Sequence, residues 1–328
     1  MYNIADIEKI TGGKFLLSNN SAAVIEHLLI DSRKLLFPSS TLFFTLAGPR
    51  RQGHAFVKDL YSKGVRSFII DATFIFLPQD FEGANIIAVK NVLQALQQLT
   101  AYHRNQFAFP VIGITGSNGK TMVKEWLCQL LQNDFNIVRS PKSYNSQIGV
   151  PLSVWQMNAN NTLGIFEAGI SQPDEMQQLA KIIAPNIGVF TSIGEAHGEG
   201  FLNIRQKINE KLKLFVNSNV LVYCADDPDL NEAVNAFKNN VRAGDSFEIF
   251  SWSKKESASL QIIATESNQG QTIISAQCKE QAFNFTIPFI DVASVENAIT
   301  CCCVLLYMGI DINATAERML QLRPVAMR

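Results

Sequence analysis

The stretch GITGSNGKT at residues 113–121 decides the fold of this chain. It overlaps the end of the apolar run VIGIT (111–115) and opens a segment in which Met122, Trp126 and Leu130 recur every four residues, the spacing of one helix face. A glycine-rich turn between a buried strand and a helix lets backbone N–H groups approach phosphate oxygens, and the helix N-terminus adds positive potential. The sequence therefore predicts a phosphate-binding loop.

The end of this loop carries its chemistry. Lys120 is expected to reach the β- and γ-phosphates of a nucleotide, and the Thr121 hydroxyl is expected to ligate Mg²⁺. The strict GxxxxGK[ST] pattern requires a glycine at the position of Ile114, so the loop matches a compact TGxxGKT variant instead. The alternative is a glycine-rich strand–helix turn that binds no ligand.

Strands and helices alternate after residue 110. The predicted strands are 111–115, 163–169, 187–194 and 220–225, and the predicted helices are 120–132, 173–183, 203–217 and 229–239. Nearly continuous apolar strands are typical of a parallel sheet covered on both faces, and the alternation predicts a doubly wound domain. β-rich runs follow between 246 and 290, then a helix near 293–308 and a short one from Asp311. The predicted fold class is α/β, with a P-loop-type central domain whose mostly parallel sheet has a β-rich extension.

The first part of the chain is predicted to form a small mixed α/β domain. LFFTLAG (42–48) and RSFIID (66–71) are typical of strands, and GHAFVKDLYSKG (53–64) is typical of a helix that ends at a glycine. A further helix is predicted at 91–104. We expect an N-terminal domain at residues 1–85 and a central domain at 86–328.

Composition argues against several classes of protein. The 328 residues are 47% hydrophobic with a net charge of −1, which argues against disorder and against nucleic-acid binding by bulk electrostatics. No apolar run approaches the roughly 18–20 residues of a membrane span, and the N-terminus lacks the pattern of a signal peptide. None of the six cysteines forms a CxxC pair, so we expect reduced thiols and a cytoplasmic protein.

Polar residues stand near the ends of two predicted strands, where ligands bind in open α/β sheets. Glu167 lies in IFEAG, and His197 lies in TSIGEAHGEG. A buried carboxylate is costly unless it is paired or bound to a metal, so the two residues favour Mg²⁺-nucleotide chemistry at the edge of the phosphate loop. In the next helix Lys207 and Lys211 share a face at i,i+4 spacing, but the residues alone do not separate them or Lys213 from a solvated face.

The segment SPKSYNSQIGVPLS (140–153) is predicted to be a loop. Its polar side chains stand between apolar elements, so Asn145 and Gly149 could face a substrate. The residues alone leave the role of this segment open.

These motifs, in this order, resemble those of the Mur ligases, the ATP-dependent amide-forming enzymes of peptidoglycan precursor synthesis. The resemblance covers essentially the whole chain and rests on DSR (31–33), LFFTLAGPRRQGHAF (42–56), GITGSNGKT (113–121), SYNSQIGVPLS (143–153), FEAGIS (166–171) and TSIGEAHGEGF (191–201). SYNSQIGVPL and FEAGIS are similar to stretches of the members that add D-alanyl-D-alanine to UDP-N-acetylmuramoyl-tripeptide. The resemblance implies these two substrates and an acyl-phosphate intermediate.

The resemblance also implies roles for individual residues. Those implied to bind ATP are Thr115, Gly116, Ser117, Asn118, Gly119, Lys120, Thr121 and, at the adenine, Asn297. Those implied to ligate two Mg²⁺ ions are Thr121, Glu167, His197 and Lys211, the last as a carbamylated lysine. Those implied to serve catalysis are Lys120, Lys211, His197 and Asn145, the last near the γ-phosphate and the acceptor. Those that resemble contacts to the uridine nucleotide are Ser32, Arg33, Gly53 and His54.

The chain departs from the family pattern in places. Met122 stands where a second threonine is frequent, and Ala293 and Ser294 stand where His-Asn is frequent upstream of Asn297. The family has a third, Rossmann-like domain, and RPVAMR (323–328) resembles the junction before it. We therefore expect that domain to be missing and the chain alone to ligate weakly or not at all. GEAHGEGF also resembles fusions of such a ligase with an alanine racemase.

Other interpretations remain open. A folylpolyglutamate-synthase-like ligase shares the phosphate loop and a related metal site, although the uridine-type segment at 31–56 argues against it. The chain could also bind nucleotides without ligating. A P-loop kinase or GTPase is disfavoured because the guanine-reading NKxD signature is absent.

Overall fold

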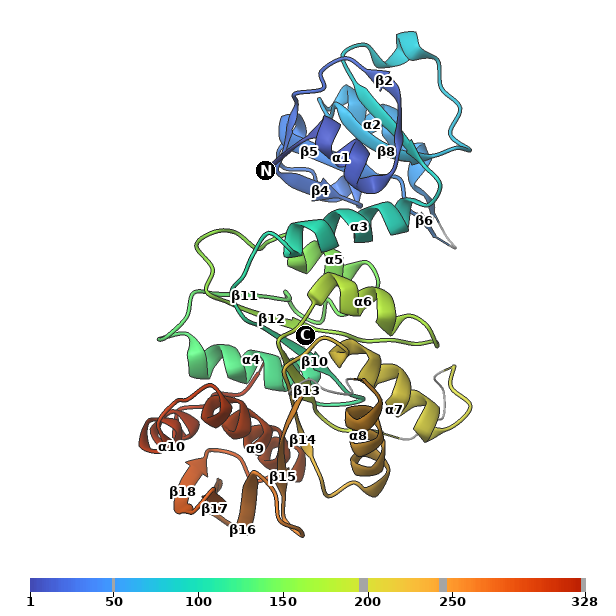
Figure 1. Ribbon diagram of the computed structural model, residues 1–328. Coiled ribbons are helices and arrows are strands. Elements are labelled where there is room, and N and C mark those ends of the chain that lie inside the picture. The colour runs from blue at the N-terminus through green and yellow to red at the C-terminus, as the bar shows by residue number, and fades with distance from the viewer. Residues whose placement is uncertain (49–50, 195–199, 242–246, 326–328) are drawn as a thin grey trace. The chain divides into compact units, whose positions relative to one another are not determined.

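The computed structural model describes residues 1–48, 51–194, 200–241 and 247–325 (Figure 1). The chain forms two compact units, Met1–Gln106 and Phe107–Arg328. Helix α3 (Val92–Arg104), which the sequence assigned to the second domain, lies in the first unit and packs against α1 (Ile4–Thr11). The side chain of Asn91 caps α3 by accepting a hydrogen bond from Gln94 N.

The first unit is built on a five-stranded sheet. In spatial order its strands are β2 (Lys14–Ser18), β9 (Asn85–Val89), β8 (Ser67–Asp71), β5 (Thr41–Phe44) and β4 (His27–Leu29). β2 runs antiparallel to β9, and the other neighbours are parallel. The two short pairs are β1 (Tyr2–Asn3) with β3 (Val24–Ile25) and β6 (Ala47–Gly48) with β7 (Arg51–Gln52). The predicted helix at 53–64 is a 3₁₀ turn, Gly53–Phe56, followed by α2 (Val57–Ser62).

The second unit is built on a nine-stranded sheet, which confirms the predicted α/β class. In spatial order its strands are β11 (Ile137–Arg139), β12 (Leu163–Glu167), β10 (Val111–Thr115), β13 (Ile187–Phe190), β14 (Val220–Cys224), β15 (Glu248–Ser253), β16 (Leu260–Asn268), β17 (Gln271–Cys278) and β18 (Gln281–Ile287). The strands are parallel from β11 to β16 and antiparallel from β16 to β18. The antiparallel part is the predicted β-rich extension. The short strand β11 was not predicted.

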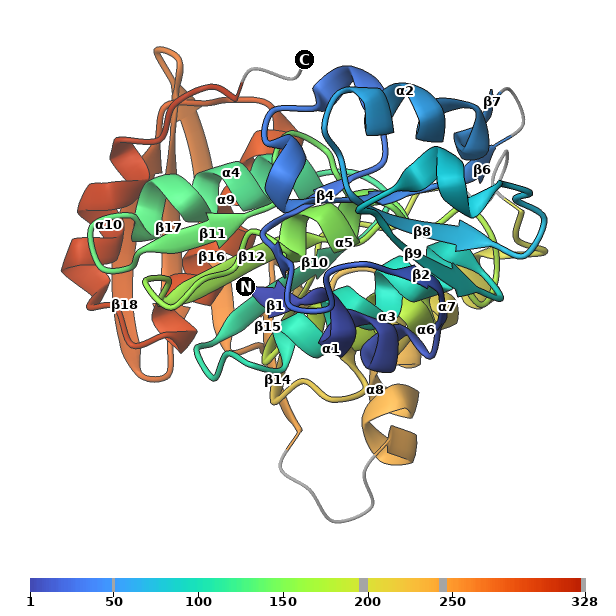
Figure 2. The same cartoon turned by 90° about the horizontal axis from the view of Figure 1, so that it is seen from above.

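Helices cover both faces of this sheet. They are α4 (Lys120–Leu131), α5 (Gly149–Val154), α6 (Met176–Ile183), α7 (Ile204–Leu212), α8 (Pro228–Val241), α9 (Val292–Tyr307) and α10 (Ile312–Leu320). α4 and α9 pack together on one face, and α7 and α8 pack together on the other (Figure 1). α10 lies against β18 in the antiparallel extension (Figure 2). Trp126 and Leu130 of α4 are buried in the core between this helix layer and the strands, as their spacing predicted.

The centre of the sheet fixes where ligands can bind. β10 pairs with β12 on one side and with β13 on the other, so the chain order reverses at β10. In open α/β sheets ligands bind beyond the carboxyl ends of the strands at such a point. The phosphate loop leaves β10 at this position, and Glu167 ends β12 beside it.

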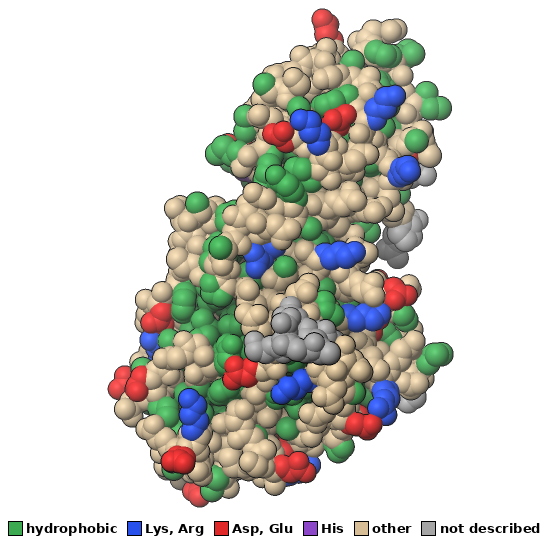
Figure 3. Space-filling view, viewed as in Figure 1, with side chains coloured by type: hydrophobic (Ala, Val, Ile, Leu, Met, Phe, Trp, Pro, Cys, Tyr) green, Lys and Arg blue, Asp and Glu red, His purple; other side chains and the backbone are tan. Residues whose placement is uncertain are grey.

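Three broader expectations can be compared with this structure. Among the described residues, none of the helices is long and apolar enough to cross a bilayer. All six cysteines lie in described parts of the chain and are free thiols. On the face drawn in Figure 3, basic and acidic side chains are interspersed, in keeping with the near-zero net charge.

Candidate nucleotide and metal site

Two glycines shape the phosphate loop. Gly116 has φ +142° and Gly119 has φ +83°, conformations that side chains disfavour. A Cβ at Gly116 would lie 2.1 Å from Thr191 Oγ1, and one at Gly119 would lie 2.3 Å from Asn297 Oδ1. The loop therefore needs glycine at both positions, for backbone conformation and for space. Gly119 also occupies the N-cap of α4, where the helix N-terminus faces the ligand site.

Hydrogen bonds hold the rest of the loop. Thr115 Oγ1 donates to Ala168 O across 2.9 Å, and Ser117 N donates to Ser192 O across 2.7 Å. Asn118 O accepts from Thr191 Oγ1. The Ser117 hydroxyl is buried and has no hydrogen-bond partner among the described residues. A buried polar atom without a partner is unfavourable unless a ligand or water forms a hydrogen bond with it. The unpaired hydroxyl therefore fits an anion-binding loop.

Lys120 curls back over the loop. Its Nζ donates to Gly116 O across 2.8 Å and to Ser117 O across 3.0 Å. Carbonyl partners on a loop of this shape can be exchanged for phosphate oxygens, which form stronger, charge-assisted hydrogen bonds. The lysine thus lies at the loop, and its contact with phosphate stays a prediction.

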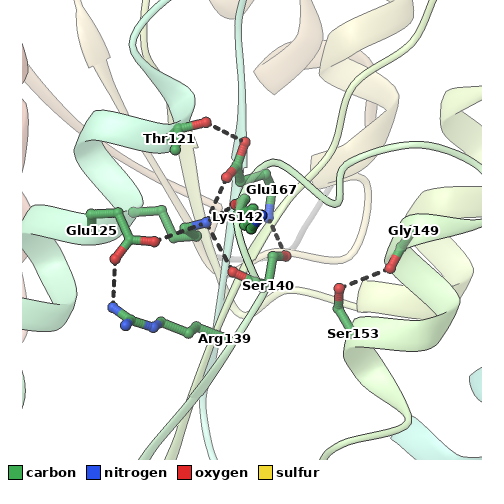
Figure 4. A network of polar contacts seen from close by, with 9 residues as sticks. Thr121, Glu125, Arg139, Ser140, Lys142, Gly149, Ser153 and Glu167 are labelled. Carbon is green, nitrogen blue, oxygen red and sulfur yellow. Dashed lines mark hydrogen bonds and ion pairs between the residues drawn. The ribbon is translucent and has the colours of Figure 1, made fainter. Parts of the chain in front are cut away.

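A buried carboxylate lies beside the loop (Figure 4). Glu167 is fully buried, and its Oε2 accepts a hydrogen bond from Thr121 Oγ1 across 3.0 Å. Its Oε1 lies 2.8 Å from Lys124 Nζ but is not aligned with it for a hydrogen bond, so within the described residues it accepts none. Sequence analysis missed Lys124, because its partners Ser140 and Glu167 are distant from it in sequence.

These donors suit Mg²⁺. The Thr121 hydroxyl and the Glu167 carboxylate are hard oxygen ligands, which Mg²⁺ prefers and supplements with water and phosphate oxygens. Glu167 Oε1 accepts no hydrogen bond among the described residues and so retains lone pairs for a cation. His197 lies outside the described residues. Among the residues that are described, no group of three or more His, Cys, Asp or Glu side chains could hold a metal.

The three lysines at 207, 211 and 213, two in α7 and the third just after it, differ in their surroundings. Lys211 is 2% exposed, and its Nζ donates to Gly116 O of the phosphate loop across 3.2 Å. Lys207 is equally buried, and its Nζ lies 3.5 Å from Gly194 O. Lys213 instead forms ion pairs with Glu210 and Asp174 at 2.5 and 3.3 Å, and the hydrogen bond to Glu210 raises its pKa. Lys211 therefore contacts the phosphate loop directly.

Asn145 lies next to the end of β12. Its carbonyl accepts from Gly169 N across 2.8 Å, and a Cβ at Gly169 would lie 3.0 Å from the Asn145 amide carbon. The prediction that 140–153 is entirely loop was wrong, because α5 starts at Gly149. Pro151 is tolerated there because the N–H groups of a first helical turn have no partner within the helix.

Next to the phosphate loop is a cavity of about 410 Å³. Its walls include Asn118 and Gly119 of the loop and Ala293, Glu296 and Asn297 of α9. The structure therefore brings Asn297 together with the phosphate loop, although the two are distant in sequence. The other lining residues, which sequence analysis did not select, include Trp252, Asp226 and Cys224. Burial raises the pKa of Cys224 to about 12, so this thiol stays protonated.

The four predicted uridine-nucleotide residues lie in the first unit, after the carboxyl ends of parallel strands. Ser32 and Arg33 follow β4, and Gly53 packs so closely on Thr45, just after β5, that a Cβ there would lie 2.5 Å from its carbonyl carbon. His54 Nε2 lies 3.2 Å from Asp71 Oδ2 at the end of β8.

Two further side chains of this edge were missed by sequence analysis. The Phe74 ring centroid lies 4.9 Å from that of His54, and Asp71 Oδ1 accepts from Thr73 N across 2.8 Å. Partial burial alone would raise the Asp71 pKa, but hydrogen bonds from Thr73 and the nearby His54 lower it overall. An aromatic face and an anionic group thus flank the predicted histidine.

The family model of the Mur ligase middle domain matches residues 114–305, more than half of the chain. The chain belongs to the Mur ligase family. This family comprises ATP-dependent acid–amino acid ligases, so the phosphate loop and the Thr121–Glu167 pair lie in the middle domain of such an enzyme.

Several relatives resemble this Mur ligase chain. UDP-N-acetylmuramoyl-tripeptide–D-alanyl-D-alanine ligase of Bacillus subtilis is 29% identical over 99% of the chain and 67% of its own length. The enzyme of that name from Treponema pallidum is 36% identical over 56% of the chain and 40% of its own length. The enzyme of the same name from Rickettsia prowazekii is covered over 60% of its length. The chain therefore spans about two thirds or less of these curated relatives.

Solved structures share the fold. A MurF crystal structure from Acinetobacter baumannii matches with a TM-score of 0.87 over 99% of this chain and 69% of that one, at 22% identity. MurF of Thermotoga maritima in complex with ADP matches with a TM-score of 0.78 over 92% of this chain and 66% of that one, also at 22% identity. The chain thus has the Mur ligase fold.

Proposed function

We propose that this chain serves the ATP-dependent ligation of D-alanyl-D-alanine to UDP-N-acetylmuramoyl-tripeptide. The observation that carries the proposal is the convergence of Lys120, Thr121, Glu167 and Lys211 on one loop at the carboxyl edge of the sheet. The names of the B. subtilis and T. pallidum relatives support the choice of these substrates. The reaction is assigned to the cytoplasm, where the precursor nucleotides and reduced thiols are expected.

The proposed chemistry is phosphoryl transfer followed by amide formation. The terminal carboxylate of the tripeptide attacks the γ-phosphate of ATP, and ADP leaves. The amine of D-alanyl-D-alanine then attacks the acyl phosphate, and inorganic phosphate leaves with formation of the amide. Phosphoryl transfer of this kind depends mainly on positioning and on cations around the transferred group.

Residues of this chain supply that positioning. Lys120 exchanges its carbonyl partners for β- and γ-phosphate oxygens, and the loop amides and the α4 N-terminus bind the same oxygens. Thr121 and Glu167 would hold Mg²⁺, which when bound neutralises charge on the phosphates. Asn145 lies near enough to the end of β12 to orient the acceptor carboxylate.

A second Mg²⁺ would need another anionic ligand, and Lys211 is our candidate. A carbamate formed from its amine and CO₂ converts a cation into a carboxylate-like group. The side chain is buried and contacts the phosphate loop, so the carbamate would be shielded from water. His197 is the remaining candidate ligand of this pair of ions.

The two nucleotides would occupy different units. The cavity beside Gly119 and Asn297 is proposed to hold the adenosine part of ATP. The edge that carries Ser32, Arg33, Gly53 and His54 is proposed to hold the uridine nucleotide. Asp71 and Phe74 belong to the same proposed site.

The test is Lys120→Ala, with Lys181→Ala, an exposed lysine of α6, as the matched control. Removal of charged hydrogen bonds worth about 1.5–3 kcal/mol should weaken MgATP binding by roughly 10- to 100-fold, measured by calorimetry. In any form of the protein that turns ATP over, phosphate release should also be lost. Binding by Lys120→Ala as tight as by the control would overturn the loop assignment.

Two other functions would use the same phosphate loop. A folylpolyglutamate-type ligase would use the same phosphate loop, and a purely nucleotide-binding protein would use both nucleotide sites without ligation. Comparison of UDP-N-acetylmuramoyl-tripeptide with a folate acceptor in an ATP-dependent phosphate-release assay separates the three. Stimulation by the uridine substrate alone supports the proposal.

A further inference from the structure

Lys124 of α4 is fully buried, and the proposed reaction gives it no part. Its Nζ lies 2.8 Å from Glu167 Oε1 and 3.1 Å from Glu125 Oε1, and it donates to Ser140 O across 2.9 Å and to Lys142 O. Burial of an ammonium group is unfavourable unless oxygens replace its water. Here four oxygens surround it.

All four oxygens belong to the protein. An ammonium has three protons and accepts no hydrogen bond; two of the protons are donated to the carbonyls of Ser140 and Lys142, and the two nearby carboxylates compensate its charge. Lys120 differs, because its Nζ donates to two carbonyls of the phosphate loop itself. Lys124 therefore acts on the protein around the site and does not bind the nucleotide.

The partners of Lys124 come from three segments that are separate in sequence (Figure 4). Glu125 is on α4, Glu167 ends β12, and Ser140 and Lys142 follow β11. The Ser140 hydroxyl also accepts from Glu167 N across 3.3 Å. All three segments meet at one ammonium group.

The segment that follows β11 needs such an anchor. Lys142 has φ +50°, an uncommon conformation for a residue other than glycine. Such backbone persists when surrounding contacts over-determine it, and the hydrogen bond from Lys124 to its carbonyl is one such contact. Three residues later the chain reaches Asn145, whose carbonyl accepts from Gly169 N.

We infer that Lys124 is a positioning residue that fixes Glu167 against Thr121 and holds segment 140–145 against the phosphate-loop helix. The inference rests on the proposed function, because it takes Glu167 as a Mg²⁺ ligand. Since Lys124 Nζ and the metal face the same carboxylate, they repel each other. Loss of the lysine charge should strengthen Mg²⁺ binding and loosen the segment.

The test compares Lys124→Met, which keeps the length of the side chain, with Lys181→Met, an exposed control on α6. Backbone amide exchange over 140–145, measured by mass spectrometry without any ligand, should rise about tenfold or more in Lys124→Met, as local opening becomes easier. In the same variant the Mg²⁺ concentration that half-saturates ADP binding should fall by about threefold or more, because one close repulsive charge is gone. Lys181→Met should change neither quantity.

Unchanged exchange over 140–145, or a half-saturating Mg²⁺ concentration that is equal or higher, overturns the inference. If Lys124→Met does not fold, Lys124→Arg decides: the retained charge should keep the Mg²⁺ dependence, while the larger guanidinium should raise exchange over 140–145. Exchange in Lys124→Arg equal to that of the wild type would contradict the anchoring role. A wild-type chain that binds no MgADP contradicts the proposed function instead, and the exchange measurement still tests Lys124.

Discussion

Thr121 donates its hydroxyl to Glu167 across 3.0 Å and so joins the first turn of the phosphate-loop helix to the end of the neighbouring strand. Glu167 also faces the buried ammonium of Lys124. The buried carboxylate accepts the hydrogen bond from Thr121 and compensates the charge of Lys124. Its negative charge would also attract a divalent cation.

The first prediction concerns Glu167→Gln. The amide keeps the shape and can still accept from Thr121, but it leaves Lys124 with less compensating charge. Because loss of one partner from a buried ion pair is strongly destabilising, the free energy of unfolding should fall by about 3 kcal/mol. Urea unfolding measures this, and Glu280→Gln, an exposed change in the β17–β18 hairpin, should stay within about 0.5 kcal/mol of the wild type.

The same variant tests the metal site. Mg²⁺ should no longer improve ADP binding to Glu167→Gln, because the amide carries no charge for the ion. Calorimetric titrations with Mg²⁺ and with EDTA measure the difference. A full Mg²⁺ effect in the folded variant would show that Glu167 is not a ligand.

The second prediction compares two glycines with nearly the same backbone angle. Gly119 has φ +83° and Gly270, in the β16–β17 hairpin, has φ +82°. Alanine at either position should lower the free energy of unfolding by about 1 kcal/mol, because a residue with a Cβ disfavours the left-handed conformation. A Cβ at Gly119 would also meet Asn297 Oδ1 at 2.3 Å, whereas one at Gly270 meets no atom within 4 Å.

Gly119→Ala should therefore lose nucleotide affinity by tenfold or more, an effect of about 1.4 kcal/mol, while Gly270→Ala should bind normally. Fluorescence titration with a nucleotide analogue measures both, and thermal unfolding should show similar backbone penalties. Equal affinities in the two variants would indicate that the contact between Gly119 and Asn297 does not matter for binding.

The third prediction concerns Lys211→Ala. If a carbamate at this position ligates a metal, phosphate release by a ligating form of the protein should be lost and should return in part with added acetate or formate. Lys213→Ala, just after the same helix, is the control, because Lys213 forms ion pairs with Glu210 and Asp174, whereas Lys211 donates to the phosphate loop. A folded Lys211→Ala protein that no short carboxylic acid rescues would argue against the carbamate.

Local patterns were enough to predict the phosphate loop, because its glycines, lysine and following helix are contiguous in sequence. Apolar runs likewise predicted β10, β12, β13 and β14, since parallel strands covered on both faces leave few polar positions. β11 was missed because it has three residues, one of them the exposed Arg139. The proline in α5 concealed that helix, because proline usually predicts a break.

The role of Lys124 could not be predicted in the same way. Next to Glu125 in an amphipathic helix, it looks like any solvated surface charge, and its burial depends on Ser140 and Glu167 from other segments. Asn297 reaches Gly119 for a similar reason, because packing of α9 on α4 is a tertiary contact. The contacts of single residues are thus predictable where the partners are neighbours in sequence, and not where the fold brings them together.

The last prediction concerns Asp31 and Arg33, where the uridine nucleotide is proposed to bind. Asp31 accepts from Arg33 Nε across 2.8 Å and from Nη2 across 2.7 Å. The side-chain hydrogen bond from Arg33 lowers the pKa of Asp31 to about 2. Because the folded value lies below the usual value of about 3.9, the pair's stabilising effect is present above that pH and is lost as the pH falls through about 2.

Carboxyl chemical shifts measured by NMR should follow Asp31 through this titration. In Arg33→Ala the midpoint should return towards about 3.9, and binding of the uridine nucleotide should weaken if Arg33 leaves Asp31 for the ligand. Lys34→Ala, which removes a neighbouring positive charge, should move the midpoint far less, because the Lys34 charge is the smallest of the influences on this carboxyl group. A wild-type midpoint near the ordinary value would mean that the Asp31–Arg33 fork does not persist in solution, and Arg33 would then be available to the nucleotide without displacement.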